Sequence, residues 1–309
     1  MSYGAHIPVL LEEAISGLAI QSQGIYLDAT YGRGGHSAAI LDALGESGRL
    51  IAMDKDPDAQ QQAREHFANE SRFELVAADF SAAESVVAKA GLTGQLSGVL
   101  IDLGVSSPQL DRAERGFSFN QDGPLDMRMD PTSGQSAKDW LATADLREMV
   151  RVFKEFGEER YAPRIARALV AQREQHSIES TLQLAEIVKH AHPKWEKGKH
   201  PATRVFQAIR IHVNSEMDAL RGILSSASTL LASKGRLVVI SFHSLEDRMV
   251  KQFMRSGFNP IERPRGLPVE FTSDHPFKPL GKPIYAGEAE LARNVRARSA
   301  VLRVAEKCT

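Results

Sequence analysis

The sequence predicts an α/β fold in which a doubly wound, mainly parallel sheet carries an inserted all-helical domain. Over the first hundred residues, apolar runs alternate with helix-like stretches, which is the pattern of a parallel sheet with helices on both faces. A glycine-rich turn follows the first apolar run, and a long helix-like segment later interrupts the alternation. We expect the sheet domain at residues 1–111 and 213–309, and a mainly helical substrate-recognition domain at residues 112–212.

The predicted strands are short and almost continuously apolar, as is typical of strands that are buried on both faces. They are Ile25–Asp28, Arg49–Asp54, Phe73–Ala77, Gly98–Leu103 and Gly235–Phe242, with a last strand ending the basic stretch Asn294–Val304. The helices expected between the first four strands are Ser37–Leu44, Asp58–Phe67 and Ala82–Ala90.

The insertion is predicted from the spacing of the fourth and fifth strands. Leu103 and Arg236 are separated by 132 residues, whereas a crossover between parallel strands needs about a dozen residues plus its helix. The helices expected there are Ala137–Leu141, Asp145–Phe156, Ala162–Gln175, Thr181–His192 and a broken Pro201–Leu231. The proline-rich stretch Arg263–Pro283 is expected to be an ordered loop.

Composition excludes several classes of protein. The only cysteine, Cys308, rules out an intrachain disulfide and a cysteine metal cluster, and a catalytic thiol is not expected so near the chain end. Glu12 and Glu13 stand where a signal peptide would be basic or apolar, and no apolar run is long enough to span a membrane, so a cytoplasmic location is the expectation.

Charge is unevenly distributed along the chain, although the net charge is only −1. Residues 1–159 hold 13 Lys and Arg against 25 Asp and Glu, whereas residues 160–309 hold 25 against 14. Such asymmetry favours a polyanionic partner for the second half, although two halves that neutralise each other would show the same numbers.

The segment Asp28–Ser37 has the composition of a cofactor-binding turn. Three glycines (Gly32, Gly34 and Gly35) allow a sharp turn and a close approach of the backbone to a ligand, and Ser37 is expected to cap the next helix. The second strand ends in Asp54, and an acid at that position suits the hydroxyls of a ribose.

The turn favours S-adenosylmethionine over a dinucleotide. A dinucleotide fingerprint reads G-x-G-x-x-G, but here the order is G-x-G-G followed by His36, and the last glycine is missing. Asp28 would repel a pyrophosphate and would tolerate a cationic ligand such as a sulfonium. NAD and a turn with no ligand are the alternatives, and no ligand set for a metal is expected.

The chemistry is expected at the carboxyl ends of the strands, where ligands of doubly wound sheets bind. Four acids lie at or near such ends: Asp28, Asp54, Asp79 and Asp102. After Asp102, the pair Ser107-Pro108 resembles the Ser/Asp-Pro-Pro-aromatic tetrapeptide of amino-methylating enzymes, although the second proline and the aromatic residue are missing.

A Ser-Pro corner can accept hydrogen bonds from an exocyclic amine and so favour the nitrogen geometry that attacks a sulfonium methyl. Because no plausible thiol nucleophile is present, a nitrogen or oxygen acceptor is favoured over a pyrimidine ring carbon. His243, just after the fifth strand, is a further candidate, with a purely structural role about equally expected.

The chain closely resembles the bacterial ribosomal RNA small subunit methyltransferase H family, the 16S rRNA cytosine-N4 methyltransferases. The motifs that carry the resemblance span nearly the whole chain: His6–Leu10, Asp28–Ser37, Asp54–Pro57, Asp102–Asp111, Arg115–Phe119, Asp122–Asp130, His200–Arg210, Ser241–Arg248 and Asn294–Arg303. One departure is Val295, where the family usually has proline.

The resemblance implies a class I, Rossmann-like methyltransferase fold and a cytidine acceptor in the decoding centre of 16S rRNA within the small ribosomal subunit. It also implies contacts to S-adenosyl-L-methionine from Gly34, Gly35, His36, Asp54, Phe80, Asp102 and Gln109. A non-catalytic RNA-binding assembly factor, a DNA amino-methylase and an NAD enzyme remain as other hypotheses.

The basic second half is expected to meet the RNA, and a homodimer is one expectation for the assembly. The residues expected to contact RNA are Arg115, Arg128, Lys197, Arg204, Arg210, Arg296 and Arg298.

Overall fold

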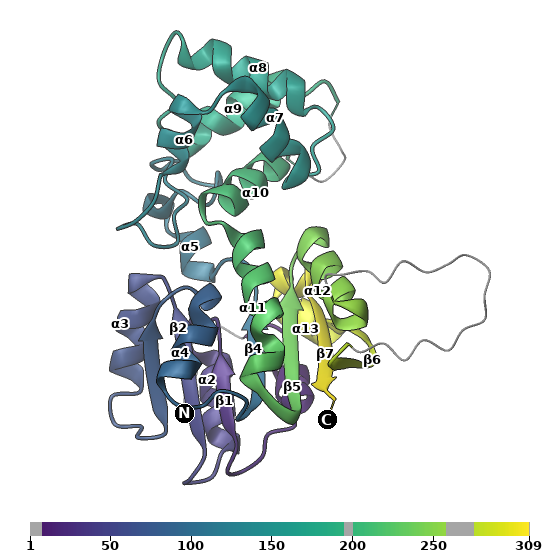
Figure 1. Ribbon diagram of the computed structural model, residues 1–309. Coiled ribbons are helices and arrows are strands. Elements are labelled where there is room, and N and C mark those ends of the chain that lie inside the picture. Colours follow the sequence, from purple (N-terminus) through teal and green to yellow (C-terminus); the bar gives the residue numbers. More distant parts are fainter. Residues whose placement is uncertain (1–7, 195–199, 258–274, 309) are drawn as a thin grey trace, which may run out of the picture. The chain divides into compact units, whose positions relative to one another are not determined.

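The computed structural model describes residues 8–194, 200–257 and 275–308, which divide into two compact units (Figure 1). The first unit contains residues up to 104 and from 218 onward, and the second contains residues 105–217. These boundaries differ from the predicted ones because Val105, Leu110 and Val213 pack against the core of the second unit and belong to it.

The first unit is built on one seven-stranded sheet of order β3-β2-β1-β4-β5-β7-β6. The strands are β1 (Ile25–Asp28), β2 (Arg49–Asp54), β3 (Phe73–Ala77), β4 (Leu96–Asp102), β5 (Leu231–Ser241), β6 (Phe277–Tyr285) and β7 (Val301–Lys307). Strands β1 to β5 are parallel, whereas β7 runs antiparallel to both β5 and β6. The sheet is therefore doubly wound, with an antiparallel edge.

Alternating side chains of the strands enter two separate cores, one on each face of the sheet. On β4, for example, Val99 and Ile101 point to one core and Leu100 to the other. Helices cover both faces (Figure 1): α1 (Leu11–Leu18), α2 (Gly35–Ala43), α3 (Pro57–His66), α4 (Ala83–Lys89), α11 (Glu216–Leu230) and α12 (Ser244–Ser256). Because both faces are covered, the central strands β1, β2, β4 and β5 are largely buried, whereas β3, at the edge of the sheet, is only partly buried.

The chain between β6 and β7 lies at the carboxyl edge of the sheet, since β6 ends and β7 begins there. It forms the short helix α13 (Glu288–Arg293) and the 3-10 turn η3 (Val295–Ser299). A second 3-10 turn, η1 (Phe80–Ala82), follows β3.

Strand β6 corrects the prediction of a loop over Arg263–Pro283. Residues 263–274 lie outside the described residues, but 277–283 belong to β6. The strand holds Pro279, Gly281 and Pro283, which would break a central strand. An edge strand tolerates prolines, because only one of its sides must pair.

The second unit is helical and has its own core. Its elements are α5 (Ser107–Asp111), η2 (Ala113–Arg115), α6 (Ala137–Thr143), α7 (Leu146–Glu155), α8 (Ala162–Arg173), α9 (Thr181–Ala191) and α10 (Ala202–Val213). The helical repeat of buried residues is clear on α7, where Met149, Val152 and Phe153 are buried. The helices were placed correctly from sequence to within two residues at most ends, because their apolar periodicity is strong.

Candidate functional site

The glycine turn after β1 is packed against the protein itself. A Cβ atom at Gly34 would clash with the ring and hydroxyl of Tyr31, and one at Gly35 would clash with the ring of Pro8. Gly32 and Gly34 also have φ values of +56° and +74°, in the left-handed region. These glycines are therefore required by the local packing and backbone, before any ligand is considered.

Ser37 does not cap helix α2, in contrast to the prediction. The helix begins at Gly35, with Gly34 as its N-cap, so Ser37 already lies inside the first turn. Its hydroxyl donates a 2.6 Å hydrogen bond to Asp28 Oδ2, and both side chains are fully buried. Burial raises the pKa of Asp28 to about 7, and the hydrogen bond from Ser37 opposes that shift.

Asp54 holds the start of the glycine turn and leaves part of its carboxylate open. Its two oxygens accept hydrogen bonds from the backbone amides of Gly32 and Asp56, each at 2.8 Å. Burial raises the pKa of Asp54 to about 6. A carboxylate can accept about four hydrogen bonds, so roughly two acceptor positions remain for the hydroxyls of a ribose.

His36 is held as a neutral ring whose free lone pair is directed at Asp102. Its Nε2 lies 3.1 Å from the carbonyl oxygen of Val9, and its Nδ1 lies 3.6 Å from Asp102 Oδ2. A carbonyl can only accept, so Nε2 must carry the proton and Nδ1 is unprotonated. Burial lowers the pKa of His36 to about 4, which keeps the ring neutral at physiological pH.

Asp102 differs from the other three acids at the strand ends in having an unsatisfied oxygen. Its Oδ1 is buried without a hydrogen-bond partner among the described residues. Burial raises the pKa of Asp102 well above its ordinary value, and the charges of Asp28 and Glu246 add to the shift. Asp79, by comparison, is paired with Lys55 Nζ at 2.9 Å. An unsatisfied carboxylate beside a histidine lone pair is an arrangement that a group donating hydrogen bonds or carrying positive charge would complete.

Phe80, the remaining cofactor residue of the first unit, begins the 3-10 turn that follows Asp79. Its side chain is half-buried and packs at the margin of one sheet core. An apolar ring in that position can cover the flat face of an adenine.

In the second unit, Ser107 and Pro108 are the first two residues of the short helix α5. The Ser-Pro corner expected from the sequence is thus the first turn of a short helix. Ser107 is 7 % exposed, and its hydroxyl makes no hydrogen bond within the described part of the chain. Gln109 is buried, and its Oε1 accepts from the backbone amide of Ser106 at 2.8 Å. Gln109 thus stabilises the helix start that presents Ser107.

His243 lies at the start of helix α12, directly after β5. It is the N-cap of α12, with its Nδ1 3.4 Å from the backbone nitrogen of Glu246 and its Nε2 3.1 Å from Glu246 Oε1. Glu246 in turn accepts from the backbone amides of Phe242 and His243. These contacts hold the start of α12, but His243 Nε2 is buried and makes no hydrogen bond with any described residue. A role of His243 in the site therefore stays a prediction.

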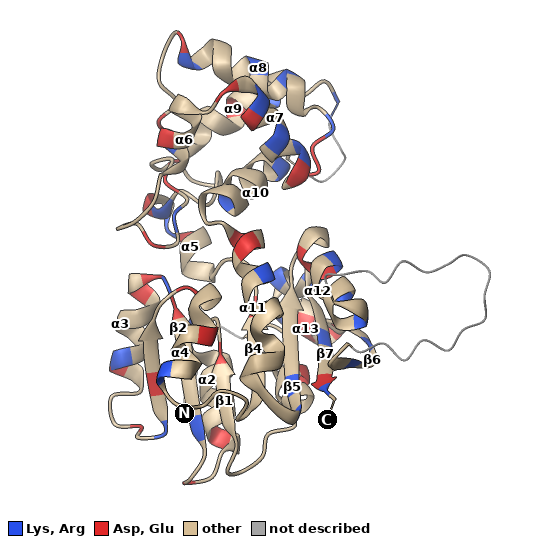
Figure 2. Ribbon diagram, in the orientation of Figure 1, with Lys and Arg blue, Asp and Glu red and all other residues tan. Residues whose placement is uncertain are grey.

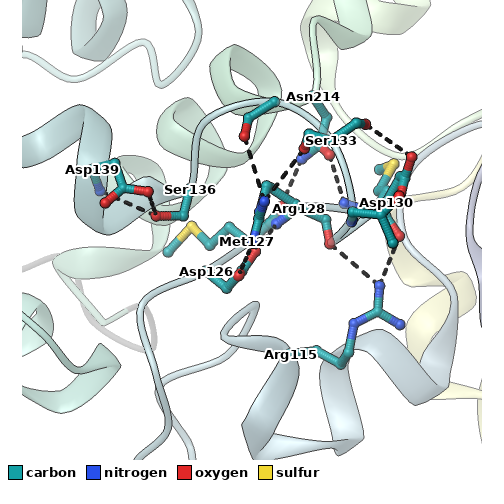
Figure 3. A network of polar contacts seen from close by, with 12 residues as sticks. Arg115, Asp126, Met127, Arg128, Asp130, Ser133, Ser136, Asp139 and Asn214 are labelled. Atoms are coloured by element: carbon teal, nitrogen blue, oxygen red, sulfur yellow. Dashed lines mark hydrogen bonds and ion pairs between the residues drawn. The ribbon is translucent and has the colours of Figure 1, made fainter.

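Two of the predicted RNA contacts, Arg115 and Arg128, lie in a network of polar contacts that organises residues 115–136 (Figure 3). Arg115 donates to the carbonyl of Met129 at 2.8 Å, and Arg128 forms a bidentate ion pair with Asp126 at 2.9 and 2.7 Å. Asn214 binds the backbone on both sides of Arg128, accepting from Met129 and donating to Met127, each at 2.7 Å. Sequence reasoning missed Asn214, because a lone Asn after a helix carries no motif.

Lys and Arg residues occur in both units (Figure 2). The other basic candidates fall into three situations. Arg210 forms a bidentate ion pair with Glu216, at 2.8 Å through both Nε and Nη2, and Arg204 is half-buried. Arg296 and Arg298, on η3, are exposed. Lys197 lies outside the described residues.

Residues 8–194, 200–257 and 275–308 contain neither a metal-ligand group nor a helix suited to a membrane. No group of three or more His, Cys, Asp or Glu side chains in them could hold a metal ion. No helix among them is both long and apolar enough to cross a membrane.

Comparison with known proteins extends over the whole chain. Residues 4–308 match the model of the MraW methylase family. The ribosomal RNA small subunit methyltransferase H of Alteromonas mediterranea is 56 % identical over 305 residues, covering 98 % of this chain and 97 % of that protein. The protein of the same name from Thioalkalivibrio sulfidiphilus is 55 % identical over 305 residues, with the same coverage.

Among solved structures, an rRNA methylase from Streptococcus thermophilus aligns with a TM-score of 0.42 and 12 % identity, covering 98 % of this chain and 99 % of that one. The match of the family model to nearly every residue identifies the chain: it belongs to the MraW methylase family.

Proposed function

We propose that this protein transfers a methyl group from S-adenosylmethionine to the exocyclic N4 of a cytidine in the decoding centre of 16S rRNA. The proposal rests on family membership and on the names of relatives that share more than half of its residues. The single structural observation that carries it is the buried Oδ1 of Asp102 at the carboxyl end of β4, which has no hydrogen-bond partner within residues 8–194, 200–257 and 275–308. A carboxylate of this kind is retained at a cost unless a ligand completes it.

The residues at the carboxyl edge fit such a donor. Asp54 has acceptor positions left for ribose hydroxyls, and Phe80 offers an apolar surface for the base. His36 and Asp102 present acceptors to a group with N–H donors or positive charge. When bound, S-adenosylmethionine supplies an electrophilic methyl group on a cationic sulfur.

The chain's own contribution to catalysis is mainly positioning. The lone pair of an exocyclic cytosine amine is delocalised into the ring, so the amine must be held in a geometry that frees it. Ser107 has a hydroxyl that is committed to no other described group and can accept from that amine. It follows Asp102 by five residues, so the two Cα atoms lie within about 18 Å for any arrangement of the chain between them.

The cytidine must leave its stack to reach a side chain of this kind, and the enzyme has to hold the neighbouring RNA while it does so. We assign the RNA contacts to Arg204, Lys197, Arg296 and Arg298, of which Arg296 and Arg298 are exposed on η3. We regard Arg115, Arg128 and Arg210 chiefly as structural residues, since each binds groups of its own unit. The assembled small subunit as substrate and a homodimer as the working form are part of the proposal.

One experiment tests the reaction. Purified protein is incubated with methyl-labelled donor and with small subunits from cells that lack this modification, or with the free rRNA, and the nucleosides are analysed by mass spectrometry. N4-methylated cytidine is expected, and Cys308→Ser should give the same yield. A ring-carbon methyl, a requirement for Cys308 or the absence of transfer to either RNA would refute the proposal. Sedimentation of the same preparation tests the homodimer.

A further inference from the structure

A hydrogen bond joins the two ends of the chain next to the donor site. Glu290 Oε1, on α13, accepts from the backbone amide of Leu10 at 2.8 Å, across 280 residues of sequence. Leu10 is fully buried and precedes α1. The bond therefore attaches residues 8–10 to the segment between β6 and β7 at the carboxyl edge of the sheet.

Leu10 has an unusual backbone conformation that this contact helps to hold. Its φ and ψ are 53° and 39°, in the left-handed region that non-glycine residues rarely adopt. Such conformations persist only where the surrounding structure imposes them, and they cluster at functional sites. Here the burial of the Leu10 side chain and the carboxylate of Glu290 act together.

The residues just before Leu10 contact the glycine turn directly. Pro8 lies so close to Gly35 that a Cβ there would clash with the proline ring. The carbonyl oxygen of Val9 accepts a hydrogen bond from His36 Nε2–H, with 3.1 Å between the two heavy atoms. The orientation and tautomer of His36 therefore depend on where residues 8–10 are held.

We propose that Glu290 is a positioning residue of the donor site: by binding the amide of Leu10 it fixes the Val9 carbonyl, which holds His36 with its Nδ1 lone pair toward Asp102. The effect passes from Glu290 to Leu10, to the adjacent carbonyl of Val9 and to the imidazole, each step a direct bond or contact. This inference rests on the proposed binding of S-adenosylmethionine at the carboxyl edge of the sheet.

The decisive variants change the acceptor and little else. Glu290→Ala removes the acceptor. Glu290→Asp keeps the carboxylate, but its side chain is one methylene shorter and no longer reaches the amide of Leu10. Glu290→Gln keeps an acceptor oxygen at the same distance from the backbone, so it should still bind the amide of Leu10. Glu288→Ala is the matched control, because Glu288 lies on the same short helix, is exposed and makes no side-chain hydrogen bond or ion pair with another described residue.

Two measurements are made on the full-length protein. Calorimetry with S-adenosylhomocysteine should show affinity about tenfold weaker for Glu290→Ala and Glu290→Asp, since the hydrogen bond that holds the Leu10 amide is lost. Glu290→Gln and Glu288→Ala should keep near-normal affinity. In the ligand-free protein labelled with 15N-histidine, His36 should show Nε2 protonated in the parent and mixed tautomers in Glu290→Ala, with His36→Gln identifying its signal.

The outcomes separate this inference from the proposed function. A parent protein that fails to bind S-adenosylhomocysteine refutes the proposed function, whereas the tautomer measurement, made without ligand, still tests the link to His36. Unchanged tautomer and affinity in both Glu290→Ala and Glu290→Asp overturn the inference. If Glu290→Ala does not fold, Glu290→Asp gives the same answer, and loss of affinity in Glu288→Ala equal to that in Glu290→Ala also overturns it.

Discussion

Asp28 and Ser37 share a 2.6 Å hydrogen bond in a place where neither side chain meets solvent. The pair joins the end of β1 to the first turn of α2, so the carboxylate that precedes the glycine turn serves the protein's own structure. The negative charge that the sequence places beside a ligand is therefore enclosed, and burial raises the pKa of Asp28 to about 7.

Stability should depend on pH through Asp28. Its pKa is higher in the folded than in the unfolded chain, so the folded state keeps a proton that the unfolded state loses between about pH 4 and pH 7, and stability falls as pH rises through that window. Asp28→Asn removes this loss. The difference in Tm, variant minus parent, should be more positive at pH 8 than at pH 5 in thermal denaturation. The same difference at both pH values, or an equal trend in the exposed control Glu84→Gln, would contradict this.

Donor binding should weaken in acid through Asp54. Burial raises its pKa to about 6, so the carboxylate is ionised above that pH and becomes protonated below it. Ribose hydroxyls bind the ionised form better, so affinity for S-adenosylhomocysteine should be full near pH 8 and fall below pH 6. Asp54→Asn should bind about ten- to a hundredfold more weakly at pH 8, with a flatter profile. Calorimetry across pH 5–8 checks this, and an unaltered profile in Asp54→Asn would assign the titration to another group.

Ser107→Ala should lower turnover while leaving donor affinity and Tm near those of the parent. Its hydroxyl has no described partner whose loss would destabilise the fold, so any effect should lie in holding the acceptor amine. Single-turnover kinetics on rRNA, together with S-adenosylhomocysteine calorimetry, separate the two. Ser106→Ala is the neighbouring control: as the N-cap of α5 it should cost about 0.5–2 kcal/mol of stability. Normal turnover in Ser107→Ala would remove the serine from the mechanism.

Arg298→Ala should weaken RNA binding in a salt-dependent way. Arg298 is exposed on η3, and if it contacts one phosphate its loss should reduce the slope of log K against log salt by about one unit. Filter binding of rRNA over a range of salt concentrations gives the slope. Lys89→Ala, an exposed cation on α4 in the acidic half of the chain, should leave the slope unchanged. Equal slopes for all three proteins would place the RNA elsewhere.

Asn214→Ala should destabilise the second unit. The side chain supplies two 2.7 Å hydrogen bonds to the backbone around Arg128, one of them to Met127, whose φ of 62° is itself unfavourable. Loss of these bonds leaves backbone groups unsatisfied, at about 1–3 kcal/mol each. Urea unfolding followed by limited proteolysis within residues 115–136 measures the effect. The exposed Asn120, exchanged for Ala in the same region, should change neither.

Sequence patterns were sufficient for elements with strong periodicity or continuous apolar character. Strands β1, β2 and β3 were predicted to the residue, because each is an apolar run bounded by polar residues. Strand β6 was not predicted, because its prolines and glycine disfavour a strand in any local stretch of sequence. They are tolerated only because β6 lies at the edge of the sheet. That position depends on pairing with β7, which sequence does not display.

The residue types of the site could be predicted from the sequence, but the separate role of each acid could not. Four acids near strand ends look equivalent in sequence, yet Asp28 is satisfied by Ser37, Asp79 by Lys55, and Asp102 alone keeps a buried oxygen without a described partner. Which acid is left open depends on contacts made by distant side chains. Ser37 is a second example. Its place before a predicted helix indicated a capping role, but the helix begins at Gly35 and the Ser37 hydroxyl binds Asp28, nine residues earlier in the chain.

The division of the sheet unit by the second unit also affects how the chain can be synthesised and folded. Strand β4 lies between β1 and β5 in the finished sheet, but 128 residues separate the end of β4 from the start of β5. At elongation rates of about 5 to 20 residues per second, the ribosome needs about 6 to 25 s to produce that stretch. During this interval one edge of a highly apolar strand has no partner, while the helical unit, whose contacts are closer in sequence, can already fold. A nascent chain of this design is most exposed to aggregation and to chaperones just before β5 emerges.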